Sequence, residues 1–415
     1  MIELTVAHLN LRGDGVGIHE GRTVHVPGVF GGERAEVAVE HRSKQHPRDV
    51  GRAVSLIEAH PARRAAPCPN HDWCGGCPLM ELSLPAQREQ KKRMLAALGL
   101  EVTSVRGDAR DEGYRWSSKR VAYAHRGRLK LGSWARGSHR GVSMRACRVD
   151  HPRIAAVFDE LEGEARHRKV LPYDEASGEG ALRYAWAKTD GERVLLTVYE
   201  AFEGAVDRAV LDALTLPDGV AVAVREGRGN AIRGEAPTML RGLEALTLDG
   251  RSIGPGGFLQ PNPALIAQAR ASLGVDGEGQ PLSGALAFDL YAGDGALAES
   301  LAARFEHVEA VESDPSLTTA PRAVEPFLTQ ATESGAAPSL VVLNPPRKGL
   351  GPKVTTSLEA LAPARIHIMS CGPEGLARDL ERLSGYRLES LDAWDTLPQT
   401  PHVELVARLV RREPK

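Results

Sequence analysis

Short alternating segments separated by glycines occupy the first 58 residues. Val24 and Val26 are separated by one polar residue, and Val37 and Val39 are separated by one alanine. Apolar residues at every second position are typical of half-buried strands. The predicted strands are Leu4–Leu9, Thr23–Val26 and Ala35–Val39, with turns at Gly13–Gly15 and Gly31–Gly32. Several short strands in so few residues favour a small β-barrel of the OB type, a common nucleic-acid module.

Beyond about residue 284 the pattern changes to short apolar runs that alternate with helical segments. The predicted strands are Ala285–Leu290, His307–Val311, Leu340–Leu343, Arg365–Met369 and Leu405–Val410, with a helix at Ala296–Arg304. Strands alternating with helices predict a parallel sheet in a Rossmann-like α/β domain. Ligands of such sheets lie beyond the carboxyl ends of the strands.

The middle of the chain mixes both patterns. Residues 85–98 are helical in pattern, and Lys119–Leu131 alternates as a hairpin around Gly127. We therefore expect three domains: a barrel at 1–60, a central α+β domain at 61–250 and an α/β domain at 251–415.

Composition fits this division. The 415 residues are 42% hydrophobic and 26% charged, which is ordinary for a globular protein of two or three domains. No run approaches the roughly 18 apolar residues of a membrane span, and the first residues lack the pattern of a signal peptide. The default expectation is a cytoplasmic monomer without membrane contact.

Charge is distributed unevenly. Residues 1–150 contain 25 Lys and Arg against 16 Asp and Glu, although the whole chain has a net charge of −2. Residues 115–148 hold ten Lys and Arg and no acid, interleaved with Trp116, Tyr123 and Trp134. Cations with aromatics suit a surface that contacts a nucleic-acid backbone and stacks bases, although a solvated basic face has the same composition.

The five cysteines divide into four and one. Cys68, Cys74 and Cys77 lie in a Cys-x5-Cys-Gly-Gly-Cys segment, and Cys147 follows the basic stretch. Four thiolates suit either zinc or an iron–sulfur cluster. The spacing differs from the paired Cys-x2-Cys knuckles of zinc sites, so a structural cluster is favoured and zinc is the alternative. The remaining thiol, Cys371, is free for chemistry.

A glycine loop follows the first strand of the α/β domain. Tyr291, Gly293 and Gly295 lie between a strand and a helix, where glycines let a backbone approach a ligand closely. Glu312 ends the next strand and is placed to accept hydrogen bonds from ribose hydroxyls. Together they indicate a nucleotide-like cofactor, whereas the loop alone also fits a plain strand–helix turn.

Three further polar residues follow or precede strands. Asn344 precedes Pro345–Pro346 and fits the wall of a pocket for a planar substrate, or a structural turn. Cys371 precedes Gly-Pro and a helix, whose start favours a thiolate, although an inert buried thiol is the alternative. Glu404 precedes the final strand. Its position fits a general base that faces a pocket, and a solvated carboxylate at a strand end is the alternative.

These motifs together resemble the RNA 5-methyluridine (uracil-C5) methyltransferases that use S-adenosylmethionine. The resemblance runs almost end to end. The barrel is similar to a TRAM domain, and Cys68, Cys74, Cys77 and Cys147 resemble the [4Fe-4S] ligands of the cluster-bearing branch. Ser370–Pro373 and Pro398–Glu404 resemble the segments of the nucleophile and the base.

The resemblance implies roles for these positions. Cys371 would add to C6 of uracil and Glu404 would remove the C5 proton. The implied cofactor pocket consists of Gln260, in a segment similar to Phe-x-Gln-x-Asn, with Tyr291, Gly293, Gly295, Glu312 and Asn344. The substrate would be RNA, with ribosomal RNA favoured over transfer RNA by the cluster branch.

Two departures leave a second function open. The family usually has Asp where this chain has Asn344, and the stretch 313–343 is short. A non-catalytic or altered RNA-binding homologue with an impaired cofactor pocket is therefore the alternative hypothesis.

Overall fold

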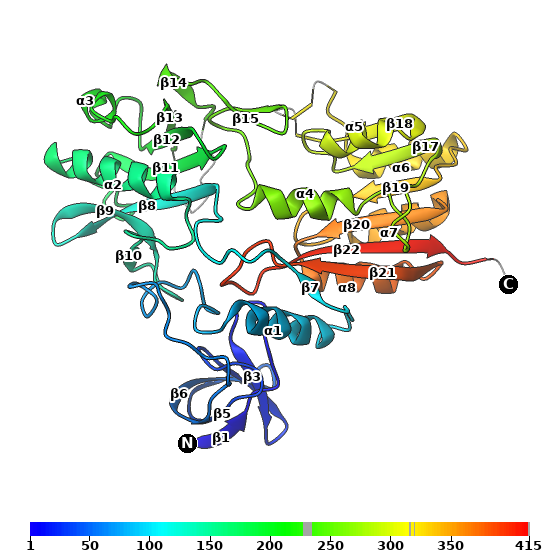
Figure 1. Ribbon diagram of the computed structural model, residues 1–415, viewed down its shortest axis with the longest axis horizontal. Helices are drawn as coiled ribbons and strands as arrows, with labels where there is room; N and C mark the ends of the chain where they lie inside the picture. Colours follow the sequence, from blue (N-terminus) through cyan, green and yellow to red (C-terminus); the bar gives the residue numbers. More distant parts are fainter. Residues whose placement is uncertain (227–234, 315–316, 319, 414–415) are drawn as a thin grey trace. The chain divides into compact units, whose positions relative to one another are not determined.

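The computed structural model describes residues 1–226, 235–314, 317–318 and 320–413 (Figure 1). They form two compact units assembled from separate stretches of the chain. The first unit contains Met1–Ala62, Pro85–Asp108 and Ala264–Lys415, and the second contains Arg63–Leu84 and Ala109–Pro263. Among the described residues, no helix is long and apolar enough to cross a membrane.

The amino-terminal part of the first unit is a curled six-stranded sheet of order β1-β5-β6-β4-β3-β2. Its strands are β1 (Ile2–Thr5), β2 (His8–Leu9), β3 (Gly15–His19), β4 (Arg22–Val26), β5 (Arg34–Arg42) and β6 (Arg48–Glu58). The predicted alternation holds at Val24, Val26 and Val37, which are buried in its core, whereas Val39 is only partly buried. A Cβ on Gly17 would lie 2.5 Å from the carbonyl oxygen of Thr5, so glycine lets β3 fold closely over the first strand.

The rest of the first unit is a mixed seven-stranded sheet of order β18-β17-β19-β20-β22-β21-β7. Its strands are β7 (Val105–Arg106), β17 (Gly284–Leu290), β18 (Phe305–Val311), β19 (Leu340–Leu343), β20 (Arg365–Ser370), β21 (Tyr386–Trp394) and β22 (Glu404–Arg411). The first four in this order are parallel, and β22 runs antiparallel to β20 and β21.

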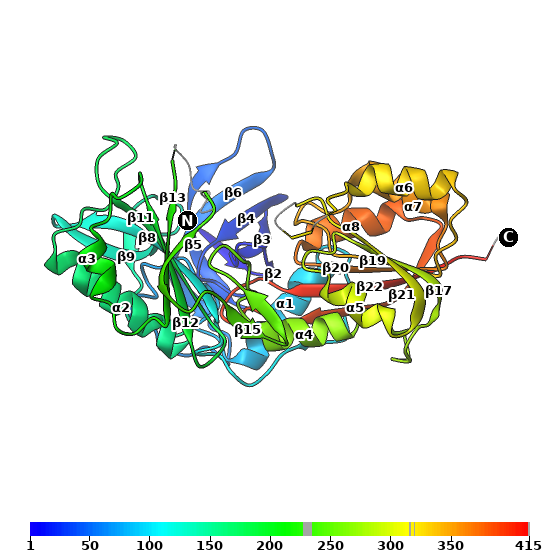
Figure 2. The same cartoon turned by 90° about the horizontal axis from the view of Figure 1, so that it is seen from above.

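Helices cover both faces of this sheet because its strands are apolar on both sides. They are α1 (Leu84–Ala96), α4 (Pro263–Ala271), α5 (Ala296–Ala302), α6 (Val324–Glu333), α7 (Gly351–Leu361) and α8 (Pro373–Arg382). Val341 and Leu343 pack with residues of α6, α7 and α8, whereas Leu340 and Val342 pack with residues of α4 and α5. Figure 2 shows these two layers of helices on opposite sides of the strands.

The carboxyl ends of the parallel strands are in register. Leu290 at the end of β17 is paired with Val311 of β18 and with Leu343 of β19, which in turn is paired with Ile368 of β20. The residues that follow these positions therefore leave the sheet at one common edge. The first unit thus provides the Rossmann-like edge at which the sequence predicts a ligand site.

The second unit is built on a seven-stranded sheet of order β10-β9-β8-β11-β12-β13-β14. Its strands are β8 (Ser117–His125), β9 (Arg128–Trp134), β10 (Gly141–Ser143), β11 (Leu182–Thr189), β12 (Val194–Glu200), β13 (Gly219–Val224) and β14 (Thr238–Gly242), with a separate pair β15 (Leu246–Leu248) and β16 (Arg251–Ile253). Helix α2 (Pro152–His167) packs Val157 and Leu161 against Leu131 and Val198 of this sheet, and α3 (Arg208–Asp212) adds Val210.

Candidate active site and cysteine cavity

Cys371 stands at the sheet edge of the first unit, directly after β20 and before α8, and its residue is exposed. Glycine lets the start of α8 approach the segment after β19, because a Cβ on Gly372 would lie 2.2 Å from the carbonyl oxygen of Arg347. The thiol lines a cavity of about 370 Å³, large enough for a small planar ligand. Its lining residues are Leu11, Arg347, Lys348, Cys371, Gly372, Pro373, Glu374, Gly375, Arg378, Pro401, His402 and Val403.

Strand pairing brings Glu404 beside the thiol. Ser370 of β20 is the register partner of Leu405 of β22, so Cys371 and Glu404 flank this pair at the same end of the two strands. The side chain of Glu404 is buried, and burial raises its pKa to about 7 against the opposing positive charges of Arg270 and Arg347. A carboxylate with a pKa near neutrality is suited to general-base work.

The pKa of the Cys371 thiol is raised, which differs from the expectation that a helix start favours the thiolate. Although part of the residue is exposed, desolvation of the sulfur by the surrounding protein is the largest cause, and the negative charge of Glu404 raises this pKa further. Arg347 opposes both through its charge and a side-chain hydrogen bond to the thiol. The guanidinium of Arg347 is therefore the group that stabilises a thiolate here, and the sequence analysis had assigned it no role.

The backbone of the predicted glycine loop adopts left-handed conformations that leave space for a ligand. Tyr291, Gly293 and Gly295 all have positive φ, at 59°, 58° and 77°, and Gly295 caps α5. The Glu312 carboxylate accepts hydrogen bonds from the backbone N–H groups of Gly293 at 2.9 Å, Ser313 at 2.7 Å and Asp314 at 2.8 Å. The acid is thus fixed against the loop at the carboxyl end of β18.

Asp289 is a buried carboxyl group near the carboxyl end of β17 that sequence reasoning did not single out. It is 1% exposed within β17, and burial raises its pKa to about 7. One of its carboxylate oxygens has no hydrogen-bond partner within the described residues. The available signal was a carboxylate inside an otherwise apolar strand, because such a group is costly to bury without a function or a partner.

Asn344 is an exposed residue that follows β19 at the same edge. Its backbone N–H donates to the carbonyl oxygen of Leu290 at 3.2 Å. The turn after it is held by Asp379 of α8. That carboxylate accepts from the backbone N–H of Leu350 at 2.6 Å and of Gly351 at 3.3 Å. Within the stretch 313–343, residues 315, 316 and 319 lie outside the described residues.

Gln260 belongs to the second unit, unlike the other predicted cofactor residues. Its segment is anchored there, since the carbonyl oxygen of Pro261 accepts from the backbone N–H of Trp116 at 2.7 Å. The fully buried Lys188 donates to the carbonyl oxygens of Gly254, Pro255 and Gly257 at 2.6, 2.9 and 2.8 Å. Burial lowers the pKa of Lys188 to about 7.

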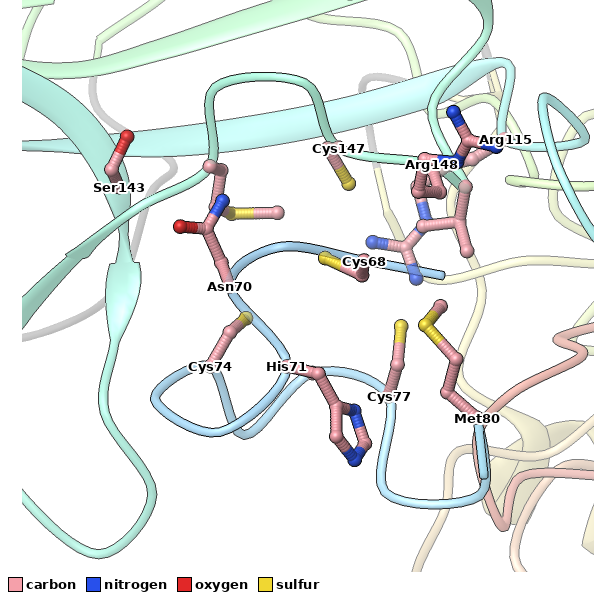
Figure 3. Close-up of a pocket in the computed structure, with 13 residues that line it drawn as sticks. Cys68, Asn70, His71, Cys74, Cys77, Met80, Arg115, Ser143, Cys147 and Arg148 are labelled. Carbon is pink, nitrogen blue, oxygen red and sulfur yellow. The ribbon is translucent and has the colours of Figure 1, made fainter. Parts of the chain in front are cut away.

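The other four cysteines line one cavity of the second unit (Figure 3). Cys68, Cys74 and Cys77 come from one segment and Cys147 from the loop after β10, and their thiols point toward a common space. Burial and the neighbouring thiols raise the pKa of Cys77 to about 12. Across the described residues, no group of three or more His, Cys, Asp or Glu is placed to hold a single metal ion.

The basic stretch has an internal part and an exposed part. Arg120 is 2% exposed and forms an ion pair with buried Asp150, so this cation is structural. Near the cysteines, Trp73 is 59% exposed and the Arg140 guanidinium lies 5.2 Å from its ring centre. An exposed tryptophan with a stacked arginine is suited to contact a nucleobase.

The fold is that of a solved methyltransferase. The chain superposes with a TM-score of 0.71 on the tRNA (uracil-54, C5)-methyltransferase of Pyrococcus abyssi, solved with S-adenosyl-L-homocysteine, over 99% of this chain and 100% of that one at 23% identity. A scan against protein-family models finds no match.

Sequence relatives identify the family. An uncharacterised RNA methyltransferase of Geobacter sulfurreducens is 32% identical over 100% of this chain and 91% of its own length. One from Gloeobacter violaceus is 30% identical over 99% of this chain and 96% of its own length. The chain therefore belongs to the RNA methyltransferases, an enzyme family, as the sequence analysis predicted.

Proposed function

We propose that the chain methylates C5 of a uracil in RNA, with S-adenosylmethionine as the methyl donor. The observation that carries this proposal is the pairing of Cys371 with Glu404. A thiol and a buried carboxylate stand side by side at the end of β20 and β22, next to a cavity. A nucleophile beside a base matches the needs of methylation at a carbon that has no lone pair of its own.

The two residues act in sequence on the base. The thiolate of Cys371, stabilised by Arg347, adds to C6 of uracil and moves the electron pair of the C5–C6 bond toward C5 and O4. When bound, S-adenosylmethionine would supply the methyl group that C5 takes up, and its sulfonium would leave as a thioether. Glu404 then removes the C5 proton, the C5–C6 double bond forms again, and the thiolate leaves. The target base must be unpaired or flipped out of its stack to reach the thiol.

The edge residues suit the cofactor of this proposal. The loop of Tyr291, Gly293 and Gly295 leaves room for a close ligand. Glu312 is held by three backbone N–H groups at the end of β18, the position from which an acid binds ribose hydroxyls in such folds. Asn344, exposed at the same edge, offers both a donor and an acceptor to the uracil edge. The contact of Gln260 with the cofactor stays a prediction of the sequence resemblance.

The test is Cys371→Ala. We expect loss of turnover on unmodified transcripts of the host's ribosomal and transfer RNAs, and loss of the covalent adduct with RNA that contains 5-fluorouridine. Binding of S-adenosylmethionine, measured by calorimetry, should persist, because the thiol lies outside the glycine loop. A fully active Cys371→Ala protein refutes the proposal. Absence of cofactor binding to the wild-type protein would favour the non-catalytic RNA-binding alternative.

A [4Fe-4S] cluster suits the four-cysteine cavity better than a single ion. Zinc needs four sulfurs at roughly 2.3 Å from one point, and the described residues contain no such group. A cluster binds each thiolate to a different iron, so its ligands surround one cavity, and the four cysteines line one cavity. We propose that Cys68, Cys74, Cys77 and Cys147 hold such a cluster in a structural role. Iron and sulfide analysis of anaerobically purified protein tests this, and stoichiometric zinc contradicts it.

The RNA itself is proposed from chemistry and from the resemblance. The basic stretch and the exposed Trp73 provide a backbone-contacting and base-stacking surface. Ribosomal RNA remains the favoured substrate over transfer RNA. Mapping of 5-methyluridine in both RNAs from cells with and without the gene identifies the target.

A further inference from the structure

Helix α1 in the first unit has an unusually polar buried face. Gln87, Gln90 and Lys91 are each 0% exposed. Spacings of three and four residues place them on one side of the helix. Buried polar side chains are costly unless each is hydrogen-bonded, and the partners of these three lie in two loops far from α1 in sequence.

Gln90 is bonded to the amino-terminal barrel. Its side-chain amide donates to the carbonyl oxygen of Gly31 at 2.8 Å and accepts from the backbone N–H of Gly31 at 2.8 Å. A Cβ at this glycine would lie 2.7 Å from the Gln90 side chain and 3.0 Å from the carbonyl oxygen of Ala7. The neighbouring Gly32 donates its backbone N–H to the carbonyl oxygen of Val6 at 2.8 Å. The Gln90 contact therefore reaches the chain shortly before residues 10–14, which we call the barrel turn.

The barrel turn contributes a wall to the cavity of the nucleophile. Asn10 stabilises the turn, since its side-chain oxygen accepts from the backbone N–H groups of Arg12 at 2.8 Å and Asp14 at 3.0 Å. Leu11 projects from this fixed turn into the lining of the cavity that contains Cys371. A barrel residue thus stands at the proposed uracil pocket.

Gln87 is bonded to the loop that precedes the proposed base. Residues 395–403, here called the base loop, connect Trp394 of β21 to Glu404 of β22, and these two residues are register partners. Gln87 donates to the side-chain oxygen of Gln399 at 2.7 Å and accepts from the backbone N–H of the same residue at 2.7 Å. Gln399 has a φ of 70°, a strained conformation for a non-glycine residue, which such paired bonds hold in place.

Lys91 holds both ends of the base loop. Its ammonium group donates to the carboxylate of Asp395 at the start of the loop and to the carbonyl oxygen of His402 at 2.9 Å near its end. A third bond at 3.3 Å reaches the carbonyl oxygen of Leu397. These bonds of Gln87 and Lys91 all run from one face of α1, so this helix restrains the start, the middle and the end of the loop.

We propose that α1 positions both walls of the Cys371 cavity: Gln87 and Lys91 set the base loop and hence Glu404, while Gln90 sets the barrel turn and hence Leu11. This inference rests on the proposed function. It makes the barrel a part of the active site in addition to any contact it makes with RNA. In Figure 1, α1 lies between the barrel strands and the end of β21 and β22, as these bonds require.

The two sets of contacts predict opposite kinetic defects. Gln87→Met keeps the side-chain volume but releases the base loop, so adduct formation on ordinary RNA should stay within about threefold of wild type, while adduct release slows about tenfold or more. The covalent protein–RNA adduct then accumulates in a single turnover. Gln90→Met releases the barrel turn, so adduct formation should slow about tenfold and release should not.

The matched control is Glu89→Met on the exposed face of the same helix, which should change neither step. Lys91→Met alone removes the nearest cation from buried Asp395 and endangers folding. The double variant Lys91→Met/Asp395→Asn is therefore measured alongside Gln87→Met. Thermal unfolding of each variant is measured alongside, and hydrogen exchange of the base loop should rise in Gln87→Met without any RNA present.

The outcomes separate the two proposals. If Gln87→Met and Gln90→Met slow formation and release in the same proportion, or neither step changes, α1 is only a structural element and the inference is wrong. If wild-type protein forms no adduct with 5-fluorouridine RNA, the proposed function is wrong. In that case, unchanged hydrogen exchange of the base loop in Gln87→Met overturns the inference independently of activity.

Discussion

The chain has two cysteine sites, and they differ in what surrounds the sulfur. In the second unit, Cys77 is one of four partly buried thiols around a cavity, and its pKa is raised to about 12 by burial and by the other thiols. In the first unit, Cys371 is an exposed residue with a carboxyl group on one side and a guanidinium on the other. One site gathers donors of the same kind, and the other combines a thiol with a base and a cation.

This difference separates a site suited to hold a ligand from a site suited to react with a substrate. Thiolates that share a buried cavity repel one another unless a cation neutralises them, so the four-cysteine site is stable only as neutral thiols or as ligands. A thiol beside Arg347 and Glu404 can lose its proton, add to a substrate and return, because the charge of each state has a partner nearby. The two sites should therefore respond in opposite ways to the same substitution.

The largest expected effect is a crossed result for Cys371→Ser and Cys77→Ser. Cys371→Ser should lower methylation about a thousandfold or more, because a hydroxyl is a far weaker nucleophile, and should leave iron content and thermal unfolding unchanged. Cys77→Ser should remove the iron of the proposed cluster and destabilise the second unit. Activity assays, iron analysis and thermal unfolding of both variants measure this. A protein that keeps its iron after Cys77→Ser would show that the cavity holds no cluster.

The second prediction concerns Glu404→Gln. This substitution removes the proposed base while keeping the shape of the side chain. Turnover should fall about a hundredfold or more, with the covalent adduct accumulating on ordinary RNA, and the wild-type rate should rise with pH through about 7 as Glu404 ionises.

The same substitution should change stability in a pH-dependent way. The folded-state pKa of Glu404, about 7, lies above its ordinary value of 4.5. Ionisation therefore opposes folding: the penalty is absent below pH 4.5, grows up to about pH 7 and is complete above it. Glu404→Gln should then raise the free energy of unfolding at pH 8 by roughly 3 kcal/mol, and by little at pH 4.5. Equal effects at both pH values would contradict the burial argument.

These sites show which parts of the structure can be predicted from sequence patterns. The strands of the α/β part follow from apolar runs, and β17, β19 and β20 begin and end within a residue of their predicted limits. Cys371 and Glu404 were recognisable as candidates from short motifs. Their proximity was not, because it depends on the antiparallel pairing of β20 with β22, which no local pattern encodes.

Burial was the other feature that the sequence did not reveal. Gln87, Lys91 and Lys188 look like ordinary solvated residues of a helix or strand, yet each is fully buried and bonded to a distant loop. The pKa of Cys371 is likewise raised by desolvation, whereas the helix start was expected to lower it. Sequence patterns therefore predicted elements and candidate chemistry, whereas charge states and loop positions required the tertiary contacts.

A third prediction tests how closely the thiol must approach its cation. Gly372→Ala places a Cβ 2.2 Å from the carbonyl oxygen of Arg347, so either α8 or the Arg347 segment must move. We expect methylation to fall about tenfold to a hundredfold, with a further rise in the pKa of Cys371 as its contact with Arg347 weakens. Thiol alkylation rates across pH measure that pKa.

The matched control is Gly163→Ala in α2, where a Cβ meets no atom within 4 Å. That change should leave activity and the alkylation profile unaltered and stabilise the helix by up to about 1 kcal/mol. If Gly372→Ala behaves like the control, the close packing of α8 on the Arg347 segment has no part in activating the thiol.

The smallest expected effect is that of Asn344→Asp, which introduces the residue that relatives of the resembled family usually carry. The position is exposed, so a new charge is well screened. The amide offers a donor and an acceptor to the edge of uracil, whereas a carboxylate only accepts. We expect KM for RNA to rise by less than about tenfold with kcat nearly unchanged, and Asn344→Ala to raise KM further. Steady-state assays on the same transcript compare the three proteins. A gain in activity for Asn344→Asp would mean that the edge of uracil meets a charge-dependent contact, and that Asn344 weakens this enzyme.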